Sequence, residues 1–146
     1  MKALLMDGVV AGGLAMLLGG CVGTQNVTAL APISNTAFSG TALTVYYFYS
    51  LNPDCTSAGV PFVEVARASG HGSVIVQKGV NHYTEYPSTS QRYKCNVNKS
   101  ASVAVTYTSD ATFLGTDRFS VRCIYPSGNV SKKDFVVNVE PARAVN

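Results

Sequence analysis

The clearest hydrophobic pattern in the chain is a two-residue alternation of apolar and polar side chains, which occurs twice between Val103 and Tyr125. Alternation with this period, with β-branched and aromatic residues on the apolar side, is typical of half-buried β-strands. The residues expected on the buried faces are Val103, Val105, Tyr107, Phe119, Val121, Cys123 and Tyr125. Turn-forming residues separate the two runs. We therefore expect a central hairpin whose turn is shaped by Phe113, Gly115 and Asp117, with the Asp117 carboxylate accepting backbone N–H bonds.

Similar segments, separated by turn signals, follow one another along the chain after residue 40. The further strands expected are Thr41–Ser50, Val60–Arg67, Ser73–Gln77, Val80–Tyr86 and Val130–Glu140, and Tyr93–Val97 is also expected to be extended. About seven short strands, with turns every eight to twelve residues and no helical period, favour an all-β antiparallel sandwich. An open barrel is the alternative architecture.

The segment Thr41–Ser50 is unusual because both of its faces carry aromatic side chains. Tyr47 and Tyr49 alternate onto one face, and Tyr46 and Phe48 onto the other. One face is expected to join the core. Tyr46 and Phe48 are therefore candidate partner-binding residues, with packing beneath a loop as the alternative explanation for their face.

The N-terminal segment has the form of a targeting sequence. Lys2 precedes an apolar stretch that ends in Leu18-Gly19-Gly20-Cys21. This arrangement resembles a bacterial lipoprotein signal peptide with its lipobox. The resemblance implies cleavage before Cys21, lipid on its thiol and acylation of its new amine. It also implies residence in the outer membrane, because Val22 rather than an aspartate follows the cysteine. Alternatives are a secretory signal cut after Ala31, or a retained membrane helix.

The remaining chain has the length of one domain. From Val22 to about Ser39 the residues are mostly small and polar, and include Pro32, which is typical of a flexible tether. The expected organisation is a signal peptide over residues 1–20, a tether over 21–40, a domain over 41–141 and a tail over 142–146.

Four segments of the expected domain resemble bacterial immunoglobulin-like (cadherin-like) repeat modules. They are Gly70–Val74, Val105–Thr108, Phe113–Phe119 and Phe135–Val139. In such modules these positions hold a His-Gly turn, a tyrosine-centred strand, a Phe-x-Gly-x-Asp-x-Phe corner and a valine-rich last strand. The resemblance implies an immunoglobulin-like sandwich that acts as a spacer or adhesive unit. This chain differs by an inserted loop, Asn81–Ser100, where an individual function would lie.

Three cysteines remain when Cys21 is assigned to the lipid. In an oxidising compartment they allow one disulfide and one free thiol. Cys55 and Cys95 lie among loop residues, whereas Cys123 lies on an inward face, so we expect a Cys55–Cys95 bridge. A core pair that includes Cys123 is the alternative.

Neither charge nor motif indicates an enzyme, a cofactor site or nucleic-acid binding. The net charge of +3 is small and the basic residues are scattered, so no patch follows a phosphate backbone. His71 and His82 lack the partners of a nucleophilic or metal site, and we expect no catalytic residue and no bound metal. Asp110 and Asp117 could hold a calcium ion, but a structural role for Asp117 is favoured.

The expected function is therefore that of a lipid-anchored, non-enzymatic envelope protein that binds another envelope protein. Tyrosine and arginine side chains commonly dominate binding surfaces, and the inserted loop carries three tyrosines and one arginine. The candidate partner-binding residues of this loop are Tyr83, Tyr86, Arg92, Tyr93 and Lys94. The alternatives are a periplasmic inhibitor, or an accessory subunit of a larger envelope or secretion assembly.

Overall fold

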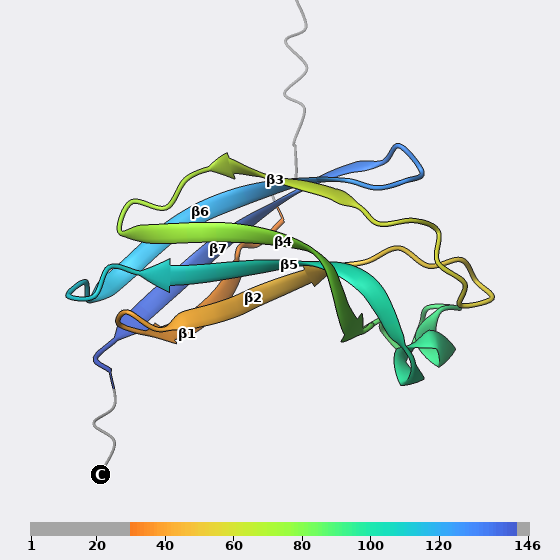
Figure 1. Ribbon diagram of the computed structural model, residues 1–146, viewed down its shortest axis with the longest axis horizontal. Helices are drawn as coiled ribbons and strands as arrows, with labels where there is room; N and C mark the ends of the chain where they lie inside the picture. Colours follow the sequence, from red (N-terminus) through yellow and green to blue (C-terminus); the bar gives the residue numbers. More distant parts are fainter. Residues whose placement is uncertain (1–29, 143–146) are drawn as a thin grey trace, which may run out of the picture.

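The computed structural model describes residues 30–142, which form seven β-strands and one short 3-10 helix (Figure 1). The elements are β1 (Ile33–Phe38), β2 (Ala42–Phe48), β3 (Phe62–Arg67), β4 (Gly72–Tyr83), η1 (Tyr93–Val97), β5 (Lys99–Ser109), β6 (Gly115–Ile124) and β7 (Val130–Glu140). In this part of the chain, no helix has the length and apolar character needed to cross a membrane.

The strands form two facing sheets, and this confirms the predicted all-β sandwich of about seven strands (Figure 1). One sheet has the order β1-β7-β6-β3 and the other β2-β5-β4. All neighbouring strands are antiparallel except β1, which lies parallel to β7. The core between the sheets includes Val103, Val105, Tyr107, Phe119, Val121, Phe135 and Val137, all of them fully buried. The alternation on β5 and β6 therefore predicted the buried faces correctly.

The two runs of the Val103–Tyr125 stretch do not form a hairpin, and that prediction was wrong. β5 belongs to the three-stranded sheet and β6 to the four-stranded sheet, so the connection between them crosses from one layer to the other. The connection is held by hydrogen bonds to a third segment, the β3–β4 turn, and not by pairing of β5 with β6. Period-2 alternation is the same for a strand in either sheet, so the pattern alone did not separate the two arrangements.

Asp117 holds this crossing in place. Its carboxylate, 4% exposed, accepts hydrogen bonds from the backbone N–H groups of Gly70 (3.0 Å), His71 (3.0 Å) and Arg118 (2.7 Å). The Tyr107 hydroxyl donates a fourth bond at 2.9 Å. The predicted structural role of Asp117 is confirmed, and its four donors come from β5, β6 and the β3–β4 turn.

The tether predicted over residues 21–40 is wrong for residues 33–38, which form β1. In this strand Ile33, Asn35 and Ala37 are partly or fully buried, while Ser34 and Thr36 are exposed. The alternation is real, but its residues are small, so composition suggested a linker. The folded domain thus includes β1 rather than beginning at residue 41, and the predicted segment 1–20 and tether residues 21–29 lie outside the described residues.

Two other predicted elements differ in the structure. The segments Ser73–Gln77 and Val80–Tyr86 merge into the single strand β4, because Gly79, at φ +76°, forms a bulge instead of a break. The segment Tyr93–Val97 is the 3-10 helix η1 rather than extended chain. Within this helix the Cys95 side chain is buried.

Candidate functional site

The inserted loop is fastened to the end of β2 by the predicted disulfide. Cys55 follows β2, Cys95 lies in η1, and the Cys55–Cys95 bridge is confirmed with a Cα–Cα distance of 5.2 Å. Cys55 adopts φ +70°, a conformation that non-glycine residues rarely take. Cys123 is a buried free thiol, as its inward position predicted. Burial raises the pKa of this thiol, so it stays protonated at neutral pH.

Hydrogen bonds shape the loop between its two ends. The Asn96 side chain accepts bonds from the Thr84 hydroxyl (3.0 Å) and the Tyr86 N–H (2.9 Å), and donates to the Tyr86 carbonyl (2.9 Å). Arg92 Nε donates to the Leu51 carbonyl at 2.6 Å. These bonds and the disulfide fix where Tyr86 and Arg92 lie relative to the end of β2.

A groove of about 770 Å³ lies where the fastened loop meets the two sheets, and we call it the tyrosine groove. One wall is continuous chain from Tyr46 to Asn52, at the end of β2. The inserted loop and the β6–β7 turn supply the rest of its lining. Its lining side chains include Tyr46, Tyr49, Glu85, Tyr86, Arg92, Tyr125, Ser127 and Asn129. Aromatic surface with a few polar groups is the common composition of binding sites.

A bulge in β2 directs its aromatic residues. The register between β2 and β5 shifts between Thr44 and Tyr46, which reverses the face of every later residue. Tyr46 and Phe48 therefore point inward, whereas Tyr47 turns outward and stacks on His82 with ring centroids 3.6 Å apart. Phe48 is only 1% exposed and packs in the core, although it also belongs to the lining of the groove.

Two phenol groups that line the groove, those of Tyr49 and Tyr125, have raised pKa values. Burial raises the pKa of Tyr49, although the Glu85 N–H donates to its oxygen at 2.7 Å. Burial, with a further contribution from the neighbouring Cys123 thiol, raises the pKa of Tyr125 to about 12. The Tyr49 hydroxyl keeps its proton and can donate to a carbonyl or carboxylate group of a ligand, whereas the Tyr125 hydroxyl is hydrogen-bonded to the Cys123 thiol. The Lys133 ammonium lies 4.7 Å from the Tyr46 ring centroid and adds positive charge.

The structure brings four of the predicted binding residues to one site. Tyr46, Phe48, Tyr86 and Arg92 line the tyrosine groove. Tyr83 and Tyr93 are 49% and 54% exposed but lie outside its lining, as does the exposed Lys94. Sequence reasoning missed Tyr49, Glu85, Tyr125 and Asn129 as groove residues. Tyr125 was assigned to a buried face, and no pattern indicated that β6 ends beside the inserted loop.

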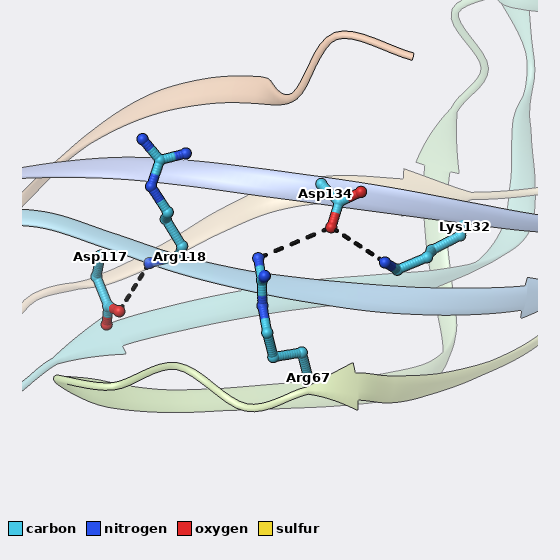
Figure 2. Close-up of polar contacts among 5 residues, drawn as sticks. All are labelled: Arg67, Asp117, Arg118, Lys132 and Asp134. Carbon is cyan, nitrogen blue, oxygen red and sulfur yellow. Dashed lines mark hydrogen bonds and ion pairs between the residues drawn. The ribbon is translucent and has the colours of Figure 1, made fainter. Parts of the chain in front are cut away.

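Away from the groove, charged residues gather on the outer face of the four-stranded sheet. Asp134 lies 3.8 Å from Arg67 and 3.5 Å from Lys132, and the Arg118 side chain points away from this group (Figure 2). Exposed ion pairs of this kind contribute little to stability. Within residues 30–142, no group of three or more His, Cys, Asp or Glu side chains is arranged to hold a metal ion.

Comparisons with known proteins add little to this description. No protein-family model matches the chain, and no curated protein matches it significantly. Amebosin, a solution structure, is similar over 75% of this chain and 100% of its own, with 14% identity and a TM-score of 0.40. The endo-fucoidan hydrolase MfFcnA4, from glycoside hydrolase family 107, is similar over 77% of this chain and 13% of its own, with 12% identity and a TM-score of 0.31. Likeness at this level assigns neither a family nor an activity.

Proposed function

We propose that this chain is a lipid-anchored, non-enzymatic binding module of the bacterial envelope, whose partner protein binds in the tyrosine groove. In this proposal an immunoglobulin-like domain is attached to the outer membrane through Cys21. The observation that carries the binding role is the fastening of an aromatic, arginine-containing loop against the end of β2. A loop held in this way loses little conformational entropy when a partner binds, so more of the contact energy contributes to affinity.

The chemistry of the groove supports a protein as its partner. Tyr86 and Arg92 belong to the residue types that most often dominate protein interfaces. Their neighbour Tyr49 presents a donor, and the Glu85 carboxylate presents acceptors, both of which can bond to the backbone amides of a partner protein. Four of the candidate residues chosen from sequence line this groove, although they come from separate segments of the chain.

Replacement of two groove residues tests the binding site. In cells treated with a crosslinker, the yield of crosslinked partner is expected to fall at least about tenfold for a Tyr86→Ala/Arg92→Ala variant. The reason is that truncating a central anchor residue of an interface commonly costs about 2 kcal/mol of binding free energy. The matched control is Tyr93→Ala/Lys94→Ala, which changes the same kinds of side chain nearby but outside the groove. If the groove variant keeps its partners while it remains folded, the proposed site is wrong.

Mass spectrometry of the mature protein tests the anchor. We expect its first residue to be Cys21 carrying diacylglycerol on the thiol and a fatty acid on the amine. A Cys21→Ser variant is expected to move from the membrane fraction to the soluble fraction, since acyl chains supply the attachment. An unmodified N-terminus at any other residue contradicts the anchor without affecting the groove.

A further inference from the structure

The pairing of β7 with β1 stops before β7 does. The parallel register runs from Ile33 opposite Phe135 to Phe38 opposite Glu140. β7 starts five residues earlier, at Val130, and there it pairs with β6 alone. Residues 130–134 thus have a strand on one side and, within the described part of the chain, no strand on the other.

The direction of the peptide groups in this segment follows from the observed bonds. The Glu140 carbonyl accepts a bond from the Ser39 N–H at 2.8 Å, so the Glu140 peptide oxygen faces the β1 edge. Peptide groups on a strand face its two neighbours alternately, and the register of β7 with β6 has no shift. Lys132, eight residues before Glu140, therefore directs its N–H and C=O toward the open edge, while those of Lys133 face β6.

The described residues that precede β1 do not pair with this edge. Leu30 is 78% exposed, and residues 30–32 lie outside the ladder. Pro32 has no N–H to donate. The open edge lies beside the tyrosine groove, because Lys133 reaches over the ring of Tyr46 and β7 follows the turn that lines the groove.

We propose that an extended segment of the partner binds as an added strand along residues 130–134 of β7 and places alternate side chains in the tyrosine groove. This inference rests on the proposed binding role of the groove and adds how the partner is recognised. Strand addition to a free edge gains affinity from backbone bonds, and neighbouring pockets select the side chains. The groove is well placed for that selection, because an added strand would point alternate residues between the sheets.

The charges of the edge favour a partner segment with acidic residues over a second copy of this chain. Two copies paired at this edge would bring Lys132 and Lys133 close to their own counterparts, and facing like charges destabilise strand pairs. Asp134 is already paired with Arg67 and Lys132 (Figure 2). Lys133 and Arg92 remain near the groove to attract carboxylates.

Amide hydrogen exchange with a synthetic peptide tests the added strand. The probe is an end-blocked decapeptide of alternating valine and threonine with a glutamate at each end. In the free protein the Lys132 amide is expected to exchange fast and the Lys133 amide slowly. Saturating peptide should slow exchange at Lys132 by at least about tenfold, as a new backbone bond would. Protection of Lys132 in the free protein, or no slowing with peptide, overturns the inference.

A proline at position 132 separates the backbone bond from the side chain. Lys132→Pro removes the N–H that faces the open edge and leaves the bonds to β6 intact, so peptide affinity is expected to fall at least about tenfold. Lys132→Ala keeps the N–H and should stay within about threefold. Equal affinity of the two folded variants overturns strand addition. A partner still crosslinked to the Lys132→Pro protein, but lost from the Tyr86→Ala/Arg92→Ala protein, would sink strand addition and leave the binding groove standing.

Discussion

Replacing Cys55 and Cys95 with alanine is expected to lower the free energy of unfolding by about 4 kcal/mol, because the bridge closes a loop of 40 residues that the unfolded chain would otherwise leave free. A second effect should appear in the groove. Without the bridge, the loop is held to the end of β2 by its hydrogen bonds and the Tyr49–Tyr86 ring contact, so Tyr86 and Arg92 are expected to be less firmly positioned. Urea unfolding of the oxidised wild type and the double variant measures the first effect.

Reduction of the wild type provides the matched control for this prediction. It breaks the same bond without changing a residue, and Cys123 is buried and already a free thiol. The reduced wild type and the double variant should therefore unfold at similar urea concentrations. A difference below about 1 kcal/mol between oxidised and reduced protein would show that the loop is held by its other contacts.

Replacing Asp117 with alanine is expected to cost about 3–5 kcal/mol, since the change leaves three backbone N–H groups and the Tyr107 hydroxyl without their acceptor. The result should be a looser crossing between β5 and β6 rather than an altered groove. Asp110→Asn is the matched control, because Asp110 is an exposed acid on the same connection and should change stability by less than about 0.5 kcal/mol. Equal effects of the two substitutions would contradict the role of Asp117.

The same carboxylate predicts how stability depends on pH. Burial raises the pKa of Asp117, but bonds from Gly70, Arg118, His71 and Tyr107 outweigh it and hold the pKa below its usual range. The unfolded chain therefore binds a proton at a higher pH than the folded chain. The contribution of Asp117 is complete above the ordinary aspartate value of about 4 and is lost as pH falls through the folded pKa. Unfolding measured between neutral pH and pH 2 should show this loss in the wild type, and a smaller one in Asp117→Asn.

The sequence predicted the parts of the fold that depend on local alternation. Val103, Val105 and Tyr107 on β5, and Phe119 and Val121 on β6, are buried as their period required. The disulfide was predictable because only Cys123 lay on an inward face. The sheet to which each strand belongs was not predictable, since a strand carries the same alternation whichever sheet it joins. β1 was missed because Ser34, Thr36 and Ala37 are too small to mark a core strand by composition.

The groove was only partly predictable for a different physical reason. Tyr86 and Arg92 were found from their residue types, which are common in interfaces. Tyr49 and Tyr125 join them only because β2 and β6 end beside the inserted loop, and this depends on the whole fold. The bulge between Thr44 and Tyr46 also reversed the faces of β2, which buried Phe48 and placed Tyr46 in the groove wall.

If Cys21 carries lipid as proposed, the parallel alignment of β1 with β7 sets how far the groove can lie from the membrane. β1 begins at Ile33, which lies opposite Phe135 on β7. The ring centroid of Phe135 is 6.1 Å from that of Tyr46 in the groove lining. β7 itself ends at the other end of the sandwich (Figure 1). Eleven residues lie between Cys21 and Ile33, and the twelve residue steps from one to the other span about 40 Å when fully extended. With Cys21 lipidated, the groove would work only inside a shallow layer next to the bilayer. A partner would have to bring its binding segment into that layer.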